Sequence, residues 1–282
     1  MTPLPSDIAA RRRAFRELHA SGCFVIPNPW DAGSARYLAS LGFKALATTS
    51  SGFAWSRARA DGSMSRDAVL GHLRELVAAT ALPVNADFES GYGATPADVG
   101  ESVRLAVAAG VAGLSIEDST GDAQHPIHPL PEALARLRAA REAIAASGGD
   151  TLLVGRAENF LHGRPDLADT IARLRAYAEA GADCLYAPGL KTREQIAAVV
   201  AAVAPKPVNL LVGATSDFTL RDIAALGVRR VSVGGALARS AWGGFMRAAT
   251  ALAEQGSFEG FAGAASGAEL NGLFADPATG RR

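Results

Sequence analysis

Residues 83–118 read PVNADFESGYGATPADVGESVRLAVAAGVAGLSIED and contain one complete repeat of the fold. Two short apolar runs, 83–87 and 113–117, are too short for helices and predict β-strands. Between them, residues 95–109 have helical period and open with a Thr–Pro pair, which is typical of an N-cap followed by proline in the first turn. Gly110 then fits the left-handed residue that ends a helix. The stretch therefore predicts two parallel strands joined by a helix.

The same alternation recurs along the rest of the chain. Six further short apolar runs, each bounded by Gly, Pro or Asp, occupy residues 23–27, 45–49, 152–156, 182–187, 207–212 and 230–234. Eight strand–helix units in 282 residues predict an α/β fold of the (β/α)8 TIM-barrel type. A doubly wound open sheet is the alternative, but residues 28–36 (NPWDAGSAR), after the first strand, lack the G-x-G-x-x-G phosphate loop that such folds usually carry.

No Pro/Gly/Ser-rich linker divides the sequence, so we expect one barrel domain over residues 1–282. Residues 6–20 predict an extra N-terminal helix, and residues 256–282 a C-terminal helical extension. Within this extension, residues 264–274 are amphipathic and lie beyond the eighth unit, so their own barrel offers them no slot.

Composition narrows the class of protein. Lys and Arg total 28, and Asp and Glu also total 28, so no charge surplus exists to bind nucleic acid phosphates. No stretch approaches the roughly 20 apolar residues that span a membrane, and the N-terminal segment is charged and amphipathic rather than a signal peptide. The two cysteines, Cys23 and Cys184, make no disulfide framework. We therefore expect a cytoplasmic protein without nucleic-acid or membrane partners.

Polar side chains follow the predicted strands at their carboxyl ends, which is where barrels of this type place their active sites. Acids at i and i+2 with another on the neighbouring strand suit a hard divalent cation such as Mg²⁺, whereas each acid alone could cap a helix. Arg156 could clamp a carboxylate or phosphoryl group, or form a salt bridge with a neighbouring acid. The turn Thr49-Ser50-Ser51-Gly52 offers hydroxyls and backbone N–H groups as an anion nest.

Four histidines give weaker evidence for a functional site than the acids and Arg156 do. His125 and His128 lie in the Gly- and Pro-containing segment 119–131, which predicts a flexible lid more readily than a metal site. His19 and His72 lie on predicted helices, and we expect both to be exposed.

In these positions the sequence resembles the isocitrate lyase/phosphoenolpyruvate mutase superfamily over nearly its whole length. The motifs that carry the resemblance are Ile26-Pro27-Asn28-Pro29-Trp30-Asp31, Ser50-Ser51-Gly52, Asp87-Phe88-Glu89-Ser90-Gly91-Tyr92-Gly93, Ile116-Glu117-Asp118 and Gly155-Arg156-Ala157-Glu158. The ordered set is specific, although no single member is. Its second metal-motif acid is Glu89, where the family pattern has Asp.

The resemblance implies a Mg²⁺-dependent barrel, with Mn²⁺ as a substitute, that acts on 2-oxo acids, dicarboxylates or their enolates. Asp87, Glu89 and Glu117 would surround the metal, mostly through its waters, with Asp61 nearby. Arg156 would bind the substrate, Asp87 would lie beside it, and the turn from Thr49 to Gly52 would take a carboxylate. The resemblance also implies a final helix exchanged between subunits of a homodimer or homotetramer.

The sequence departs from the family at two places. Residues 119–125 (STGDAQH) lack the Lys and the general-acid Cys of the lyase branch, and also the Lys and Asn of the mutase branch. Strands six and seven end in Tyr186-Ala187-Pro188-Gly189 and Asn209-Leu210-Leu211-Val212, which also differ from the lyase patterns. We therefore expect a carbon–carbon lyase or decarboxylase of the oxaloacetate decarboxylase or methylisocitrate lyase type, with weak cleavage of isocitrate or methylisocitrate themselves. The proton donor stays open among catalytic candidates Tyr92, Asp61 and the lid histidines.

Three other functions are compatible with the sequence. Within the family, phosphonopyruvate hydrolase or phosphonomutase chemistry would break a P–C bond. A metal-free aldolase would need a Schiff-base lysine at a strand end, and only Lys191 has a suitable place, since Lys44 and Lys206 precede their strands. A non-catalytic barrel that only binds a dicarboxylate is the third, and the intact acid set argues against it.

Overall fold

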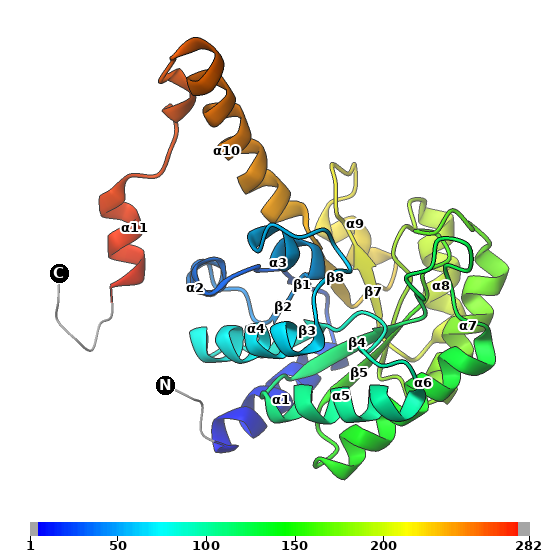
Figure 1. The fold of residues 1–282 in the computed structure, drawn as a ribbon. Coiled ribbons are helices and arrows are strands. Elements are labelled where there is room, and N and C mark those ends of the chain that lie inside the picture. The colour runs from blue at the N-terminus through cyan, green and yellow to red at the C-terminus, as the bar shows by residue number, and fades with distance from the viewer. Residues whose placement is uncertain (1–4, 276–282) are drawn as a thin grey trace.

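The computed structural model describes residues 5–275 and contains one sheet of eight parallel strands (Figure 1). The strands are β1 (Phe24–Ile26), β2 (Leu46–Ala47), β3 (Val84–Asp87), β4 (Gly113–Glu117), β5 (Leu152–Arg156), β6 (Cys184–Tyr186), β7 (Val208–Leu211) and β8 (Arg230–Ser232). Their order in the sheet is β1-β8-β7-β6-β5-β4-β3-β2. Each lies within one of the eight predicted runs.

The sheet curls into a nearly closed barrel. β1 pairs with β8 in parallel, so the first and last strands are neighbours. β1 and β2 share no ladder, but the Ala47 backbone N–H donates to the Pro27 carbonyl at 3.0 Å and bridges the gap between them. The predicted (β/α)8 architecture is thereby confirmed.

Helices alternate with the strands and surround the barrel. They are α2 (Ala32–Ser40), α3 (Ser50–Ser56), α4 (Arg66–Ala79), α5 (Pro96–Ala108), α6 (Leu130–Ala146), α7 (Leu167–Glu179), α8 (Arg193–Val203), α9 (Leu220–Ala225) and α10 (Ala236–Gln255). Thr95 caps α5, and the side chains of Thr95 and Asp98 form a reciprocal capping box. Gly110 follows with φ of 93°, a left-handed conformation that glycine adopts without steric cost. The local signals in the sequence therefore act as predicted.

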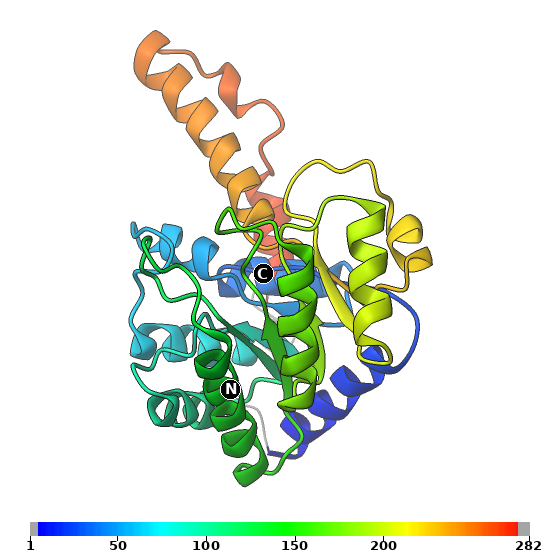
Figure 2. The same ribbon diagram turned by 90° about the vertical axis from the view of Figure 1, so that its right-hand side faces the viewer.

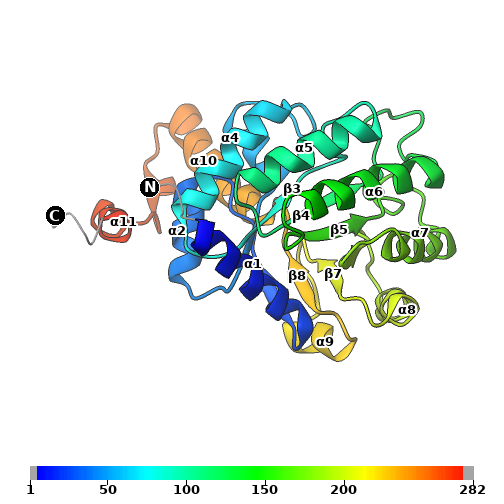
Figure 3. The ribbon, with the colours of Figure 1, turned by 90° about the horizontal axis from the view of Figure 1, so that it is seen from below.

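The N-terminal helix α1 (Pro5–Ala20) closes the end of the barrel opposite the active-site rim (Figure 3). Phe15 is fully buried there in a cluster with Ile26 of β1, Ala45 just before β2 and Leu152 at the start of β5. His19 is also buried, 8% exposed, so the expectation of an exposed side chain was wrong. Its Nδ1 lies 2.7 Å from the Phe15 carbonyl, and since that oxygen only accepts, Nδ1 carries the proton.

His72 on α4 is the second histidine whose predicted exposure was wrong. It is 4% exposed and stacks on Phe53 with ring centroids 3.9 Å apart. Burial lowers its pKa to about 4, so the ring is neutral and behaves as part of the core.

The C-terminal elements project from the barrel (Figures 1 and 2). After α10, the chain turns through the left-handed Gly256 into a short 3₁₀ helix (Glu259–Phe261) and ends in α11 (Gly267–Phe274). We call the segment from α10 to α11 the C-terminal arm. Several of its large apolar side chains are exposed, among them Phe245 (62%) and Phe258 (68%). Phe274 touches the α2 region, where the Arg36 guanidinium lies over its ring at 5.8 Å. The predicted exchange of this segment between subunits stays a prediction, and the extension beyond residue 275 lies outside the described residues.

Between residues 5 and 275, the structure holds no helix with both the length and the apolar character needed to cross a bilayer. Both cysteines are free, and Cys184 is buried whereas Cys23 is half-buried just before β1. Burial raises the pKa of both thiols.

Candidate active site

A cavity of about 170 Å³ opens at the carboxyl ends of the strands and reaches down into the barrel. Five of the predicted substrate-binding residues line it: Thr49, Ser50, Ser51, Asp87 and Arg156. Asp61 lines it as well. The other lining residues are Asn28, Ala47, Thr48, Asn85, Ser115, Tyr186, Asn209, Leu211, Arg230, Ser232, Gly234 and Gly235.

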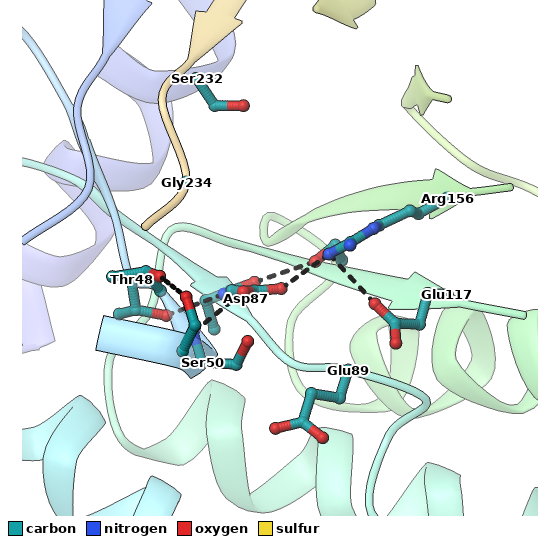
Figure 4. Close-up of polar contacts among 12 residues, drawn as sticks. Thr48, Ser50, Asp87, Glu89, Glu117, Arg156, Ser232 and Gly234 are labelled. Atoms are coloured by element: carbon teal, nitrogen blue, oxygen red, sulfur yellow. Dashed lines mark hydrogen bonds and ion pairs between the residues drawn. The ribbon is translucent and has the colours of Figure 1, made fainter. Parts of the chain in front are cut away.

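Asp87, at the end of β3, connects two sides of the cavity (Figure 4). Its Oδ2 accepts a hydrogen bond from the Ser50 backbone N–H at 3.0 Å, and its Oδ1 lies 3.1 Å from Arg156 Nη1. Its own backbone N–H donates to Thr48 Oγ1 at 2.8 Å. The carboxylate is therefore held by α3 and β5, and the backbone of Asp87 is held by Thr48, which directly follows β2.

Arg156, at the end of β5, points between acids from neighbouring strands (Figure 4). Nη1 lies 3.0 Å from Glu117 Oε2, and Nε donates to Glu158 Oε1 at 2.5 Å. Burial alone would lower the pKa of Arg156, but the charges of Glu117 and Glu158 outweigh it and hold the pKa well above its usual value. Nη2 has no protein hydrogen bond within residues 5–275 and remains available to a ligand. Both sequence interpretations of Arg156 are therefore compatible, since the salt bridges leave one amine free.

Glu89 and Tyr92 form a pair beside the cavity rather than in its lining. The Tyr92 hydroxyl donates to Glu89 Oε1 at 2.5 Å. Both residues are left-handed, with φ of 47° and 52°, which is costly for non-glycine residues and typical of functional sites. Burial raises the pKa of Glu89 to about 7, despite the hydrogen bond from Tyr92, and burial with the Glu89 charge raises that of Tyr92.

The carboxylates at this rim outnumber the cations that contact them. Burial raises the pKa of Glu117 well above its usual value, with Arg156 opposing and Glu158 and Asp87 adding to the shift. Within the described part of the chain, no three His, Cys, Asp or Glu side chains are arranged to ligate a metal directly. The oxygen donors and their excess negative charge nevertheless fit a hard divalent cation that keeps several of its waters.

The predicted anion nest forms the start of α3. Thr49 is its N-cap, and the Gly52 backbone N–H donates to Thr49 Oγ1 at 3.3 Å. Gly52 packs so tightly that a Cβ would lie 2.9 Å from the Trp30 Cβ, which explains the glycine. The backbone N–H of Ser50 donates to Asp87 and that of Gly52 donates to Thr49. Of these three amides, that of Ser51, a residue that lines the cavity, is left for a ligand within residues 5–275.

Asp118, although next to Glu117, turns away from the rim. It is 2% exposed and accepts hydrogen bonds from the Tyr177 hydroxyl at 2.6 Å and from Arg173 Nη1 at 3.0 Å. Its Oδ1 also accepts from the Glu158 backbone N–H at 2.8 Å. Asp118 therefore connects the loop after β5 to α7 and takes no part in the rim.

His125 and His128 lie in the predicted lid segment, residues 119–131, and neither is among the residues that line the cavity. A single antiparallel bridge between Ser119 and Ile127 ties its base. His125 is exposed and lies 3.3 Å from Asp122, whereas His128 Nδ1 lies 3.1 Å from Glu132. Neither histidine lines the cavity, so Asp61 is the one proton-donor candidate among the four that does.

Sequence reasoning missed the polar residues deeper in the barrel. Asn85, Asn209 and Arg230 are almost completely buried, at 3%, 1% and 3% exposure. Each stands inside an apolar strand run, and a strand interior is an unusual place for such side chains. A polar or charged residue within an apolar strand run is therefore the sequence feature that could have identified these three residues.

A sequence model of the phosphoenolpyruvate phosphomutase family matches residues 15–253. An oxaloacetate decarboxylase from Bradyrhizobium diazoefficiens is 30% identical over 213 residues, which cover 68% of each chain. The chain therefore belongs to the phosphoenolpyruvate phosphomutase family, within the isocitrate lyase/phosphoenolpyruvate mutase superfamily.

Solved structures agree with this assignment. A chain from Burkholderia cenocepacia J2315 is 51% identical, with a TM-score of 0.93 and coverage of 96% of this chain and 98% of its own. Oxaloacetate acetylhydrolase, in complex with its product oxalate, is 26% identical with a TM-score of 0.84 and 94% coverage of both chains. A 2,3-dimethylmalate lyase is 26% identical with a TM-score of 0.83, and the match covers 96% of this chain and 95% of that chain. The predicted membership of this superfamily of carbon–carbon lyases and mutases is thereby confirmed.

Proposed function

We propose that this enzyme cleaves or decarboxylates a 2-oxo acid or 2-hydroxy dicarboxylate through an enolate, with Mg²⁺ or Mn²⁺ as its cofactor. The observation that carries the proposal is the free Nη2 of Arg156 beside Asp87 in a cavity at the carboxyl ends of the strands. Relatives named for oxaloacetate and 2,3-dimethylmalate support this substrate class.

Arg156 binds the oxygen on which negative charge develops. Three acids fix its guanidinium, so it needs no reorganisation during the reaction, and preorganised donors of this kind give the largest electrostatic stabilisation. The backbone N–H of Ser51 at the start of α3 takes the carboxylate next to the 2-oxo group, since that of Ser50 already donates to Asp87.

The cation would be held by Asp87, Glu89 and Glu117. Their carboxylate oxygens suit a hard metal, and the single positive charge of Arg156 does not balance three carboxylates. When bound, the metal supplies Lewis-acid polarisation of the substrate carbonyl. Asp87 has a second duty, since it also positions Arg156 and the Ser50 amide.

Asp61 is our candidate for proton transfer to the enolate. It lines the cavity mouth on an exposed loop after α3, and partial desolvation with the charge of Asp87 raises its pKa, although hydrogen bonds to Ser50 and Gly62 oppose the shift. A raised pKa brings an acid closer to the range useful for proton transfer at neutral pH. Tyr92 keeps a supporting place, because its hydroxyl orients Glu89.

Closure of segment 119–131 over the cavity would exclude water and protect the enolate from stray protonation. We further propose one domain, a homodimer or homotetramer with exchanged C-terminal helices, and a cytoplasmic location. The exposed apolar arm formed by α10 and α11 supports the oligomer.

Phosphonopyruvate-type P–C chemistry is the second candidate, which the match to the phosphomutase family favours. One substrate panel separates the candidates: oxaloacetate, 2-hydroxy dicarboxylates branched at position 3, and phosphonopyruvate, with Asp87→Ala as the matched inactive variant. We expect 2-oxo acid products or CO2 from the first two groups. Release of phosphate alone would replace the proposal by P–C chemistry, and no turnover on any member would leave a carboxylate-binding barrel.

A further inference from the structure

The interior of the barrel below the rim is polar. Barrels of this fold usually fill this space with layers of branched aliphatic side chains. Here Asn85, Asn209 and Arg230 point into it from β3, β7 and β8, and all three line the lower part of the same cavity that Arg156 lines above. A cation 3% exposed in a barrel interior requires a partner.

The hydrogen-bond partners of Arg230 among the described residues are all neutral. Nε donates to Asn209 Oδ1 at 2.8 Å, and Nη1 donates to Asn85 Oδ1 at 3.3 Å. Nη1 also lies 3.5 Å from His19 Nε2, the nitrogen without a proton. No carboxylate of residues 5–275 lies within 4.0 Å of the guanidinium, and Nη2 forms no hydrogen bond with any of them.

The contrast with Arg156 shows what is missing. Arg156 contacts three carboxylates, whereas Arg230, which lines the same cavity, contacts none of those in the described part of the chain. Burying an unpaired charge is costly, and the cost is removed when an anion enters. Ser232 lines the same cavity two residues after Arg230 on β8, and its oxygen accepts from Asn209 Nδ2 at 2.9 Å. Its hydroxyl also interacts with Tyr186, and by turning from that ring it can donate to the same anion.

We infer that the cavity floor is a carboxylate subsite, in which Arg230 Nη2 and the Ser232 hydroxyl hold the remote carboxylate of a dicarboxylate substrate. The inference rests on the proposed function for the other end of that substrate, at Arg156 and the start of α3. A carboxylate held by a guanidinium is stabilised in its charged form, so losing it as CO2 would be opposed. The subsite therefore suits a cleavage that leaves both carboxylates intact, such as that of a 2-hydroxy dicarboxylate.

Calorimetric titration of the Mg²⁺-loaded protein with succinate and butyrate tests the subsite, because the two probes share four carbons and differ by one carboxylate. We expect the wild type to bind succinate more tightly. Arg230→Gln should weaken succinate binding by roughly tenfold to a hundredfold, the effect of a charge-assisted hydrogen bond, and change butyrate binding less than about twofold. The control is Arg229→Gln, at a half-buried neighbour that donates to the Gly22 carbonyl, and this change should alter the binding of neither probe.

Asn209→Asp supplies a second variant that preserves the fold. Its carboxylate keeps the oxygen that accepts from Nε and can take a bond from Ser232, so it fills the subsite with an internal anion. It should abolish the preference for succinate. Equal affinity of the wild type for both probes, equal weakening of both in Arg230→Gln, or a preference that survives in Asn209→Asp would overturn the inference. Binding is measured without turnover, so failure of every oxo acid as a substrate would remove the proposed function alone.

Discussion

Acidification from pH 8 to pH 5 should destabilise the protein through His19, beneath the barrel. Burial first, and then the charge of Arg230, lowers the pKa of His19 from 6.5 to about 3. Below pH 6.5 the imidazole of His19 therefore binds a proton in the unfolded chain but not in the folded chain. The free energy of unfolding consequently falls as the pH is lowered from 6.5 to about 3. At pH 5 the gap from 6.5 is 1.5 units, worth about 2 kcal/mol at 1.36 kcal/mol per unit. Buried His72 adds a similar, separate contribution.

Urea unfolding followed by tryptophan fluorescence at pH 8 and pH 5 measures this loss. His19→Asn retains an N–H donor for the Phe15 carbonyl and removes the titrating ring. The drop in unfolding free energy between the two pH values should be smaller in this variant by about 2 kcal/mol. His125→Asn, at an 81% exposed side chain, is the control and should behave as the wild type. An undiminished drop in His19→Asn would refute the reasoning.

Three further predictions concern metal, thiols and assembly. EDTA should abolish turnover and Mg²⁺ or Mn²⁺ restore it, and Asp87→Ala should lower kcat/KM by roughly a hundredfold to a thousandfold with an unchanged circular dichroism spectrum; full turnover in chelator would contradict the metal. Iodoacetamide should leave most activity intact, because burial raises the pKa of both Cys23 and Cys184; rapid inactivation against which substrate protects would place a thiol in the cavity. Light scattering at micromolar concentration should give at least twice the chain mass of 29.0 kDa, since the α10–α11 arm exposes apolar surface; a monomer would remove the exchanged helix.

Local signals decided most of the fold. The β4 run, 113–117, and the cap at Thr95 depend on neighbours in the sequence, and both appear where predicted. Strand ends also placed Asp87 and Arg156 on one rim, because the carboxyl ends of parallel strands meet there.

The placements that could not be predicted from the sequence depend on contacts between residues far apart in the chain. Asp118 follows Glu117 directly, yet alternation in an extended chain turns it outward to Arg173, 55 residues further on. His19 lies on an amphipathic helix, but α1 crosses the barrel end and brings it next to Arg230, 211 residues away. Neither partner can be identified from the residues around it.

Hydrogen exchange into pyruvate tests enolate formation at this site most directly, because it requires no knowledge of the physiological substrate. The methyl protons of pyruvate are followed by NMR in D2O with Mg²⁺ and enzyme. We expect exchange well above the buffer rate, lost in EDTA and in Asp87→Ala, and strongly reduced in Arg156→Lys, which lacks the planar fork. Exchange at the buffer rate with the wild-type enzyme, or undiminished exchange in Asp87→Ala, would contradict the proposal that this rim stabilises the enolate of a 2-oxo acid.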